Sequence, residues 1–125
     1  MENKYRVLIA DDLEEMRELL KTTIEPLNYS INAETEDSME TLRLIVTIQP
    51  DIVFLDINMP VKTGLDVLAE MKTMDLNVFP VIVSGYSTVT NVQEAMQLGA
   101  RGFVVKPYST EKIQQILEKF NSEQS

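Results

Sequence analysis

The stretch from Asp51 to Pro60, Asp-Ile-Val-Phe-Leu-Asp-Ile-Asn-Met-Pro, constrains the fold of this chain more than any other. Its apolar residues 52–55 are branched or aromatic and too few for a buried helix, so they predict a strand. Because no polar residue alternates with them, we expect both faces of the strand to be covered, as in a parallel sheet. A carboxylate at the end of such a strand, Asp56, is costly to bury without a cation beside it. Asp56 therefore marks a candidate functional site.

The rest of the chain alternates between strands and helices. Further strands are predicted at residues 5–10, 29–35, 78–83 and 102–105, and the alternation within 29–35 is typical of an edge strand. Apolar stripes at helical spacing predict helices over residues 13–27, 39–46, 65–71, 89–96 and 113–120, and their methionines Met39, Met71 and Met96 are expected in the core. Regular alternation of strand and helix predicts an α/β fold, a doubly wound (βα)5 three-layer sandwich with helices on both faces of the sheet.

Composition excludes several classes of function. The chain has no cysteine, which excludes disulfides and thiolate chemistry, and no histidine, which excludes histidine acid–base catalysis and most zinc sites. A formal net charge of −9 argues against direct binding of nucleic acid or of an anionic membrane by this domain. With no apolar run that approaches a membrane span and no signal peptide, we expect one cytoplasmic domain.

Polar residues stand at the carboxyl ends of four predicted strands. They are Asp11 and Asp12, then Asp56, Ser84 and Lys106. In an open α/β sheet ligands bind beyond these ends, so the three carboxylates, the hydroxyl and the ammonium should meet in one crevice. Clustered oxygen ligands select Mg2+ or a similar hard cation. A carboxylate is also a competent nucleophile for phosphoryl transfer, with Mg2+ and lysine offsetting the phosphoryl charge.

These residues resemble the receiver domain of bacterial response regulators. The resemblance rests on the Asp11-Asp12 pair, the Asp-Ile-Asn-Met-Pro stretch at Asp56, Ser84, and the Phe-Val-Val-Lys-Pro stretch from residue 103, and it covers essentially the whole chain. It implies a flavodoxin-like fold with parallel strand order 2-1-3-4-5. It also implies a receiver domain over residues 1–121. Residues 122–125 form a polar tail, either a terminus or the start of a linker.

The resemblance assigns roles to individual residues. Asp56 would accept the phosphoryl group from a phosphohistidine of a sensor histidine kinase or phosphotransfer protein. Mg2+ would be held by Asp12, by Asp56 and by the backbone carbonyl of Asn58, with Asp11 acting largely through water. Lys106 would pair with the phosphoryl group or with Asp56, and Ser84 would donate a hydrogen bond to the phosphoryl group. Asp56, Lys106 and Ser84 would form the catalytic set.

Other positions of the resemblance concern the response to phosphorylation. Ser84 and Phe103 would be switch residues, while Asn58 and Tyr86 would tune autodephosphorylation. Residues 88–120, the fourth helix, fifth strand and fifth helix, would form the face that changes and contacts an output domain, a partner protein or, in a phosphorylation-promoted homodimer, a second copy. Such a domain is not an enzyme in the usual sense, because it catalyses only its own phosphorylation and dephosphorylation.

Two functions of other classes compete with this interpretation. A phosphohydrolase of the haloacid-dehalogenase type needs a second aspartate two residues after the nucleophile, where this chain has Asn58. A flavodoxin-like binding module needs a phosphate loop of backbone donors after the first strand, where this chain has Asp11, Asp12, Glu14 and Glu15. A receiver that no longer accepts phosphate is disfavoured because every charged site position is present.

Overall fold

The computed structural model describes residues 5–85, 89–106 and 109–124 of the chain, and the side chains of residues 89 and 90 are not described. Five strands form one sheet in the order β2-β1-β3-β4-β5, and every neighbouring pair is parallel. The strands are β1 Tyr5–Ala10, β2 Tyr29–Thr35, β3 Ile52–Asp56, β4 Phe79–Ser84 and β5 Gly102–Val105. This strand order confirms the prediction, and β2 lies at an edge as expected.

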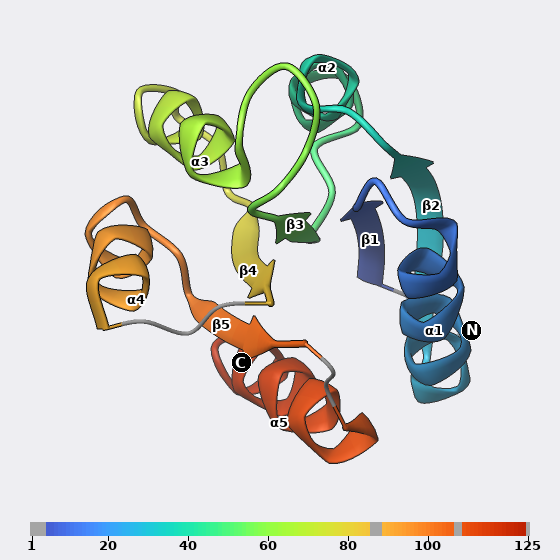
Figure 1. Ribbon diagram of the computed structural model, residues 1–125. Helices are drawn as coiled ribbons and strands as arrows, with labels where there is room; N and C mark the ends of the chain where they lie inside the picture. Colours follow the sequence, from blue (N-terminus) through green and yellow to red (C-terminus); the bar gives the residue numbers. More distant parts are fainter. Residues whose placement is uncertain (1–4, 86–88, 107–108, 125) are drawn as a thin grey trace.

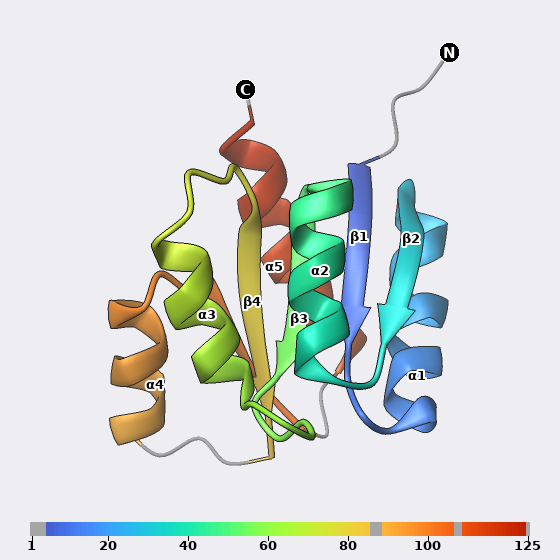
Figure 2. The same cartoon turned by 90° about the horizontal axis from the view of Figure 1, so that it is seen from above.

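Helices cover both faces of the sheet (Figures 1 and 2). They are α1 Glu14–Ile24, α2 Ser38–Ile48, α3 Gly64–Lys72, α4 Val89–Gln97 and α5 Thr110–Ser122, and a 3-10 turn, η1 Glu25–Leu27, follows α1. One face packs against α1 and α5, and the other packs against α2, α3 and α4. The three-layer doubly wound sandwich is therefore confirmed. None of the helices in the described part of the chain has the length and apolar character needed to cross a membrane.

The central strand β3 explains the uninterrupted apolar run in the sequence. All of its residues are buried, and successive side chains point to opposite faces of the sheet. Ile52 and Phe54 belong to the core beneath α1 and α5, whereas Val53 and Leu55 belong to the core beneath α2, α3 and α4. Both faces of β3 are covered, so neither face needs polar residues.

The expectation that the three methionines of the helical stripes are core residues was wrong for two of them. Met71 is 8% exposed, but Met39 is 52% and Met96 is 46% exposed. In α2 the position that faces the sheet near Met39 is taken by a polar residue, Thr41, which is fully buried. Its hydroxyl lies 2.6 Å from that of Thr35, so neither of these two buried hydroxyls lacks a partner. Hydrophobic spacing alone cannot reveal a buried stripe that includes satisfied hydroxyl groups.

Candidate functional site

The polar residues at the strand ends come together at the carboxyl edge of the sheet, the edge that faces the viewer in Figure 1. Asp11 follows β1, Asp56 ends β3, Ser84 ends β4, and Lys106 follows β5. Carboxylate oxygens of Asp11, Asp12 and Asp56 all lie within 4.8 Å of one another. Asp11 and Asp56 are almost fully buried, while Asp12 is exposed. The sheet thus brings three acidic groups from two strand ends into one cluster.

Lys106 bridges the two buried carboxylates. Its Nζ lies 2.9 Å from Asp11 Oδ2 and 3.2 Å from Asp56 Oδ2, and its side chain is only 16% exposed. Its backbone amide donates to the carbonyl of Ser84 at 2.7 Å, which ties the end of β5 to the end of β4. The ammonium therefore lies at the centre of the site, where it partly offsets the charge of the acidic cluster.

Asp11 retains acceptor capacity in a buried position. Its Oδ1 accepts a hydrogen bond from the Leu13 amide at 2.9 Å. Its Oδ2 forms the ion pair with Lys106, but outside hydrogen-bond geometry, and has no hydrogen-bond partner. A buried oxygen with free lone pairs beside two further carboxylates is the kind of group that a hard cation coordinates. Two ligands of one Mg2+ at about 2.1 Å each lie at most about 4.2 Å apart, which is close to the 4.8 Å within which these oxygens lie, so the donor set suits a magnesium ion.

The electrostatics of the site reflect an excess of negative charge. Burial first, and then the nearby charge of Asp11, raise the pKa of Asp56 to about 6, although Lys106 and the Asn58 amide favour the ionised form. Burial lowers the pKa of Lys106, but Asp11 and Asp56 together outweigh it and raise the pKa above its ordinary value. One ammonium does not balance three carboxylates, and a divalent cation would supply the missing positive charge.

The loop between β3 and α3 holds Asp56 by close backbone contacts. The Asn58 amide donates to Asp56 Oδ1 at 3.2 Å, and the Gly64 amide donates to the carbonyl of Ile57 at 2.8 Å. A Cβ on Gly64 would lie 2.4 Å from the carbonyl oxygen of Asp56, so only glycine permits this approach. Asn58, predicted as a cation ligand through its carbonyl, is exposed and adjacent to the cluster.

The same loop contains a turn that the sequence did not predict. The Lys62 amide donates to the carbonyl of Pro60 at 3.0 Å, with Val61 between them at a φ of 78°. The buried Ser38 hydroxyl clamps this turn, since it donates to the Pro60 carbonyl at 3.0 Å and accepts from the Lys62 amide at 2.8 Å. Positive φ is unfavourable for a β-branched residue, so the clamp holds a strained backbone next to the site. No sequence motif indicates that Ser38 takes part.

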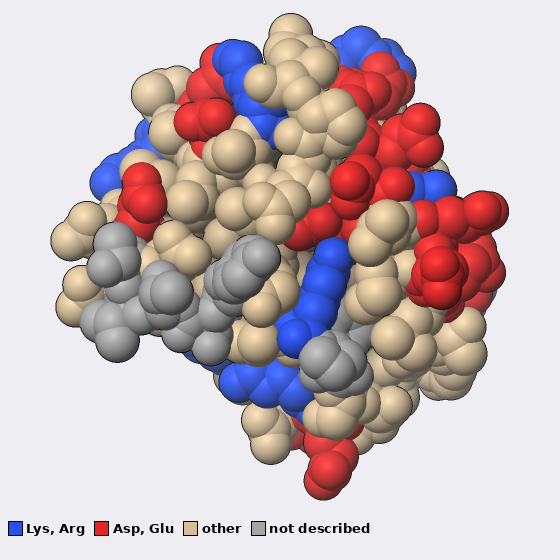
Figure 3. All heavy atoms as spheres, viewed as in Figure 1, with Lys and Arg blue, Asp and Glu red and all other residues tan. Residues whose placement is uncertain are grey.

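The two predicted switch residues, Ser84 and Phe103, differ in how deeply they are buried. Ser84 is 1% exposed at the end of β4. Phe103 is partly buried and packs against the core beneath α2, α3 and α4. Tyr86, predicted to tune dephosphorylation, lies outside the described residues. Figure 3 shows the face of the molecule that contains the carboxyl edge of the sheet, and on this face the acidic side chains gather on the side of α1 and β2.

The fold and the site first define a general class, the flavodoxin-like doubly wound α/β proteins with an acidic site at the carboxyl edge of the sheet. Within that class, residues 7–118 match the sequence model of the response regulator receiver domain. The chain belongs to this family. Receiver domains are signalling modules of two-component systems, which interact with kinases or phosphotransfer partners and typically bind Mg2+ at an acidic pocket, so the chain acts in phosphorylation-dependent signalling.

Individual relatives match over nearly their whole length. The chain is 32% identical over 114 residues to the chemotaxis protein CheY of Listeria monocytogenes, which covers 91% of this chain and 96% of that protein. A DNA-binding response regulator of the LuxR family from Staphylococcus aureus has a TM-score of 0.87 and 30% identity, over 94% of this chain and 98% of that one. A CheX–CheY–BeF3–Mg2+ complex from Borrelia burgdorferi has a TM-score of 0.88 and 26% identity, over 92% of this chain and 87% of that one.

Proposed function

We propose that Asp56 is the phosphoacceptor, and that it takes its phosphoryl group from a phosphohistidine of a sensor histidine kinase or phosphotransfer protein. The observation that carries this proposal is the buried Lys106 ammonium, which bridges Asp11 and Asp56. A carboxylate oxygen of Asp12 lies within 4.8 Å of carboxylate oxygens of both aspartates. A carboxylate placed beside an ammonium and other carboxylates can attack phosphorus while its surroundings bind the phosphoryl oxygens.

The residues of the site divide the chemistry of transfer between them. A carboxylate oxygen of Asp56 forms a bond to phosphorus as the bond from phosphorus to the imidazole nitrogen of the donor breaks, and the released histidine takes up a proton. Lys106 would then pair with a phosphoryl oxygen, and the Ser84 hydroxyl would donate a hydrogen bond to another. Asp12, Asp56 and the Asn58 carbonyl would hold Mg2+ directly and Asp11 largely through water, and the cation would supply charge neutralisation.

The response to phosphorylation would be a shift between two conformations. Ser84 moving toward the phosphoryl group and Phe103 turning inward would transmit the change to the face formed by α4, β5 and α5. That face would contact an output domain, a partner protein or, in a homodimer, a second copy of the chain. Asn58 and Tyr86 would set how fast the phosphoryl group is hydrolysed. The domain catalyses only its own loading and hydrolysis and turns over no other substrate.

Loading by a small-molecule phosphodonor tests the proposal. The protein is incubated with acetyl phosphate and Mg2+, and its intact mass is measured, with Asp56→Asn as the matched control. We expect the mass of one phosphoryl group to be added to the parent, not to the variant, and not when a chelator removes the metal. A beryllium fluoride mimic, named with Mg2+ in one solved relative, offers a second probe. An unmodified parent, or equal labelling of the variant, would rule out Asp56 as the acceptor.

A further inference from the structure

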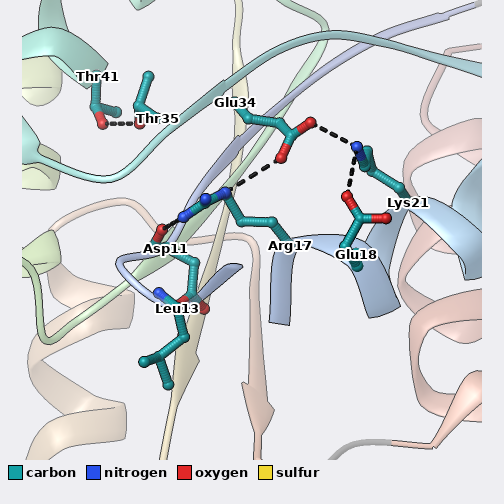
Figure 4. Close-up of polar contacts among 8 residues, drawn as sticks. All are labelled: Asp11, Leu13, Arg17, Glu18, Lys21, Glu34, Thr35 and Thr41. Atoms are coloured by element: carbon teal, nitrogen blue, oxygen red, sulfur yellow. Dashed lines mark hydrogen bonds and ion pairs between the residues drawn. The ribbon is translucent and has the colours of Figure 1, made fainter. Parts of the chain in front are cut away.

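An arginine contacts the backbone of Asp11, one member of the acidic cluster, and forms its ion pair with Glu34 (Figure 4). Arg17, on α1, donates from Nη1 to the backbone carbonyl of Asp11 at 2.6 Å. Its Nε donates to Glu34 Oε1, on β2, at 3.1 Å, and its side chain is only 13% exposed. The guanidinium thus binds the neutral backbone carbonyl of Asp11, a candidate cation ligand, while its ion pair is with Glu34.

Glu34 is itself held in place from a second side. Its other oxygen, Oε2, lies 2.7 Å from Lys21 Nζ, and Lys21 also pairs with Glu18 Oε2 at 2.8 Å (Figure 4). The bond from Lys21 first, and then the pair with Arg17, lower the pKa of Glu34 from its ordinary value. The two basic and two acidic side chains offset one another, so this network adds no net formal charge to the site.

The position of Arg17 requires an explanation, because a stronger partner is close by. Hydrogen bonds between a guanidinium and a carboxylate are roughly twice as strong as neutral ones, and Asp11 and Asp12 offer carboxylates next to the carbonyl that Arg17 binds. Glu34 satisfies that preference from the side away from the cluster. An arginine freed from Glu34 could turn toward the cluster and compete with a divalent cation for the same oxygens.

We propose that Glu34 is a positioning residue for the cation site, acting through Arg17. It holds the guanidinium on the Asp11 carbonyl, which fixes the loop that carries Asp11 and Asp12 and keeps the guanidinium away from their carboxylates. The same end of β2 supports this loop directly, since the Asp11 amide donates to the Thr35 carbonyl at 3.0 Å. This inference rests on the proposed cation site.

Titration with Mg2+, followed by the NMR signals of the loop amides, tests the inference. Glu34→Gln should raise the Kd for Mg2+ about tenfold, the scale expected when a residue that orients metal ligands is lost. The matched control is Glu18→Gln, which removes the same charge from the same network but leaves the pair between Arg17 and Glu34 in place. Its Kd should stay within about twofold of that of the parent. Equal effects of the two variants would overturn the inference.

A double-mutant cycle separates positioning from simple charge. If Glu34 acts through Arg17, then Glu34→Gln should have no further effect on the Kd in an Arg17→Gln background. The same fold-change in both backgrounds would show that Glu34 acts on the cation directly and would refute the inference. Thermal unfolding in a chelator checks that each variant is folded. A parent that binds no Mg2+ would remove the proposed cation site and the inference with it, an outcome distinct from failure of the cycle alone.

Discussion

Replacing Asp56 with asparagine should stabilise the folded protein at neutral pH when divalent cations are removed, because the parent then buries an ionised carboxylate at a net free-energy penalty. The pKa of Asp56 is about 6, against an ordinary value of 3.8. Each unit of difference in pKa is worth about 1.4 kcal/mol, so above pH 7 the ionised Asp56 lowers the free energy of unfolding by about 3 kcal/mol relative to a neutral group. Asparagine approximates the neutral carboxyl group, and the pKa of Asp56 already includes the favourable contacts with Lys106. The expected net gain is therefore about 3 kcal/mol.

The pH dependence gives this prediction its sign. Since the pKa of Asp56 is raised in the folded state, the folded state binds more protons than the unfolded state between pH 3.8 and about 6. The contribution of Asp56 to the free energy of unfolding is thus fully present below pH 3.8 and is lost as the pH rises through about 6. Asparagine does not titrate, so the advantage of the variant should grow across this interval and then level off.

Urea unfolding in the presence of a chelator measures the difference. Because the chain has no tryptophan, circular dichroism is the suitable signal. Asp75→Asn serves as a control, since Asp75 is an exposed aspartate beyond α3. The reasoning would be refuted if Asp56→Asn were less stable than the parent at about pH 8, or if its advantage were the same at about pH 4 and about pH 8.

Three other perturbations give independent checks. Mg2+ at about ten times its Kd should stabilise the parent by about 1.4 kcal/mol, measured as a rise in melting temperature. Asp12→Ala should abolish this rise, and an equal rise in the variant would contradict the site. Gly64→Ala should lower the free energy of unfolding by about 1–3 kcal/mol and weaken Mg2+ binding, since its Cβ would meet the Asp56 carbonyl oxygen at 2.4 Å; unchanged urea midpoints would contradict this. Val61→Gly should raise the free energy of unfolding by about 1 kcal/mol, because glycine tolerates the positive φ at this residue and the valine side chain, 76% exposed, contributes little packing. A lower urea midpoint would show that the turn is not strained.

The sequence predicted those features that depend on local pattern. The apolar run before Asp56 indicated a strand with two buried faces, and β3 has that environment because it lies in the middle of the sheet. Asp11, Asp56 and Lys106 could be expected to meet because parallel strands bring their carboxyl ends to one edge. The spacing of these residues along the chain therefore contained most of the information about the site.

Features that depend on contacts between distant elements could not be predicted in this way. Arg17 and Glu34 meet only because α1 packs beside β2, and neither residue belongs to a recognisable motif. Ser38 clamps the turn at Val61 across a separation of more than twenty residues, and its hydroxyl gives no signal in the sequence. The exposure of Met39 likewise follows from the burial of Thr41. Each of these outcomes depends on side-chain packing that hydrophobic periodicity does not encode.

A crystal structure of the protein with Mg2+ and beryllium fluoride would show whether Asp56 lies in a phosphoacceptor site. We expect a cation between the carboxylates of Asp12 and Asp56, a beryllium fluoride group on a carboxylate oxygen of Asp56, and the Lys106 ammonium in contact with a fluorine atom. A cation bound elsewhere, or an unmodified Asp56 with Lys106 still bridging to Asp11, would contradict the proposal that this edge of the sheet is a phosphoacceptor site.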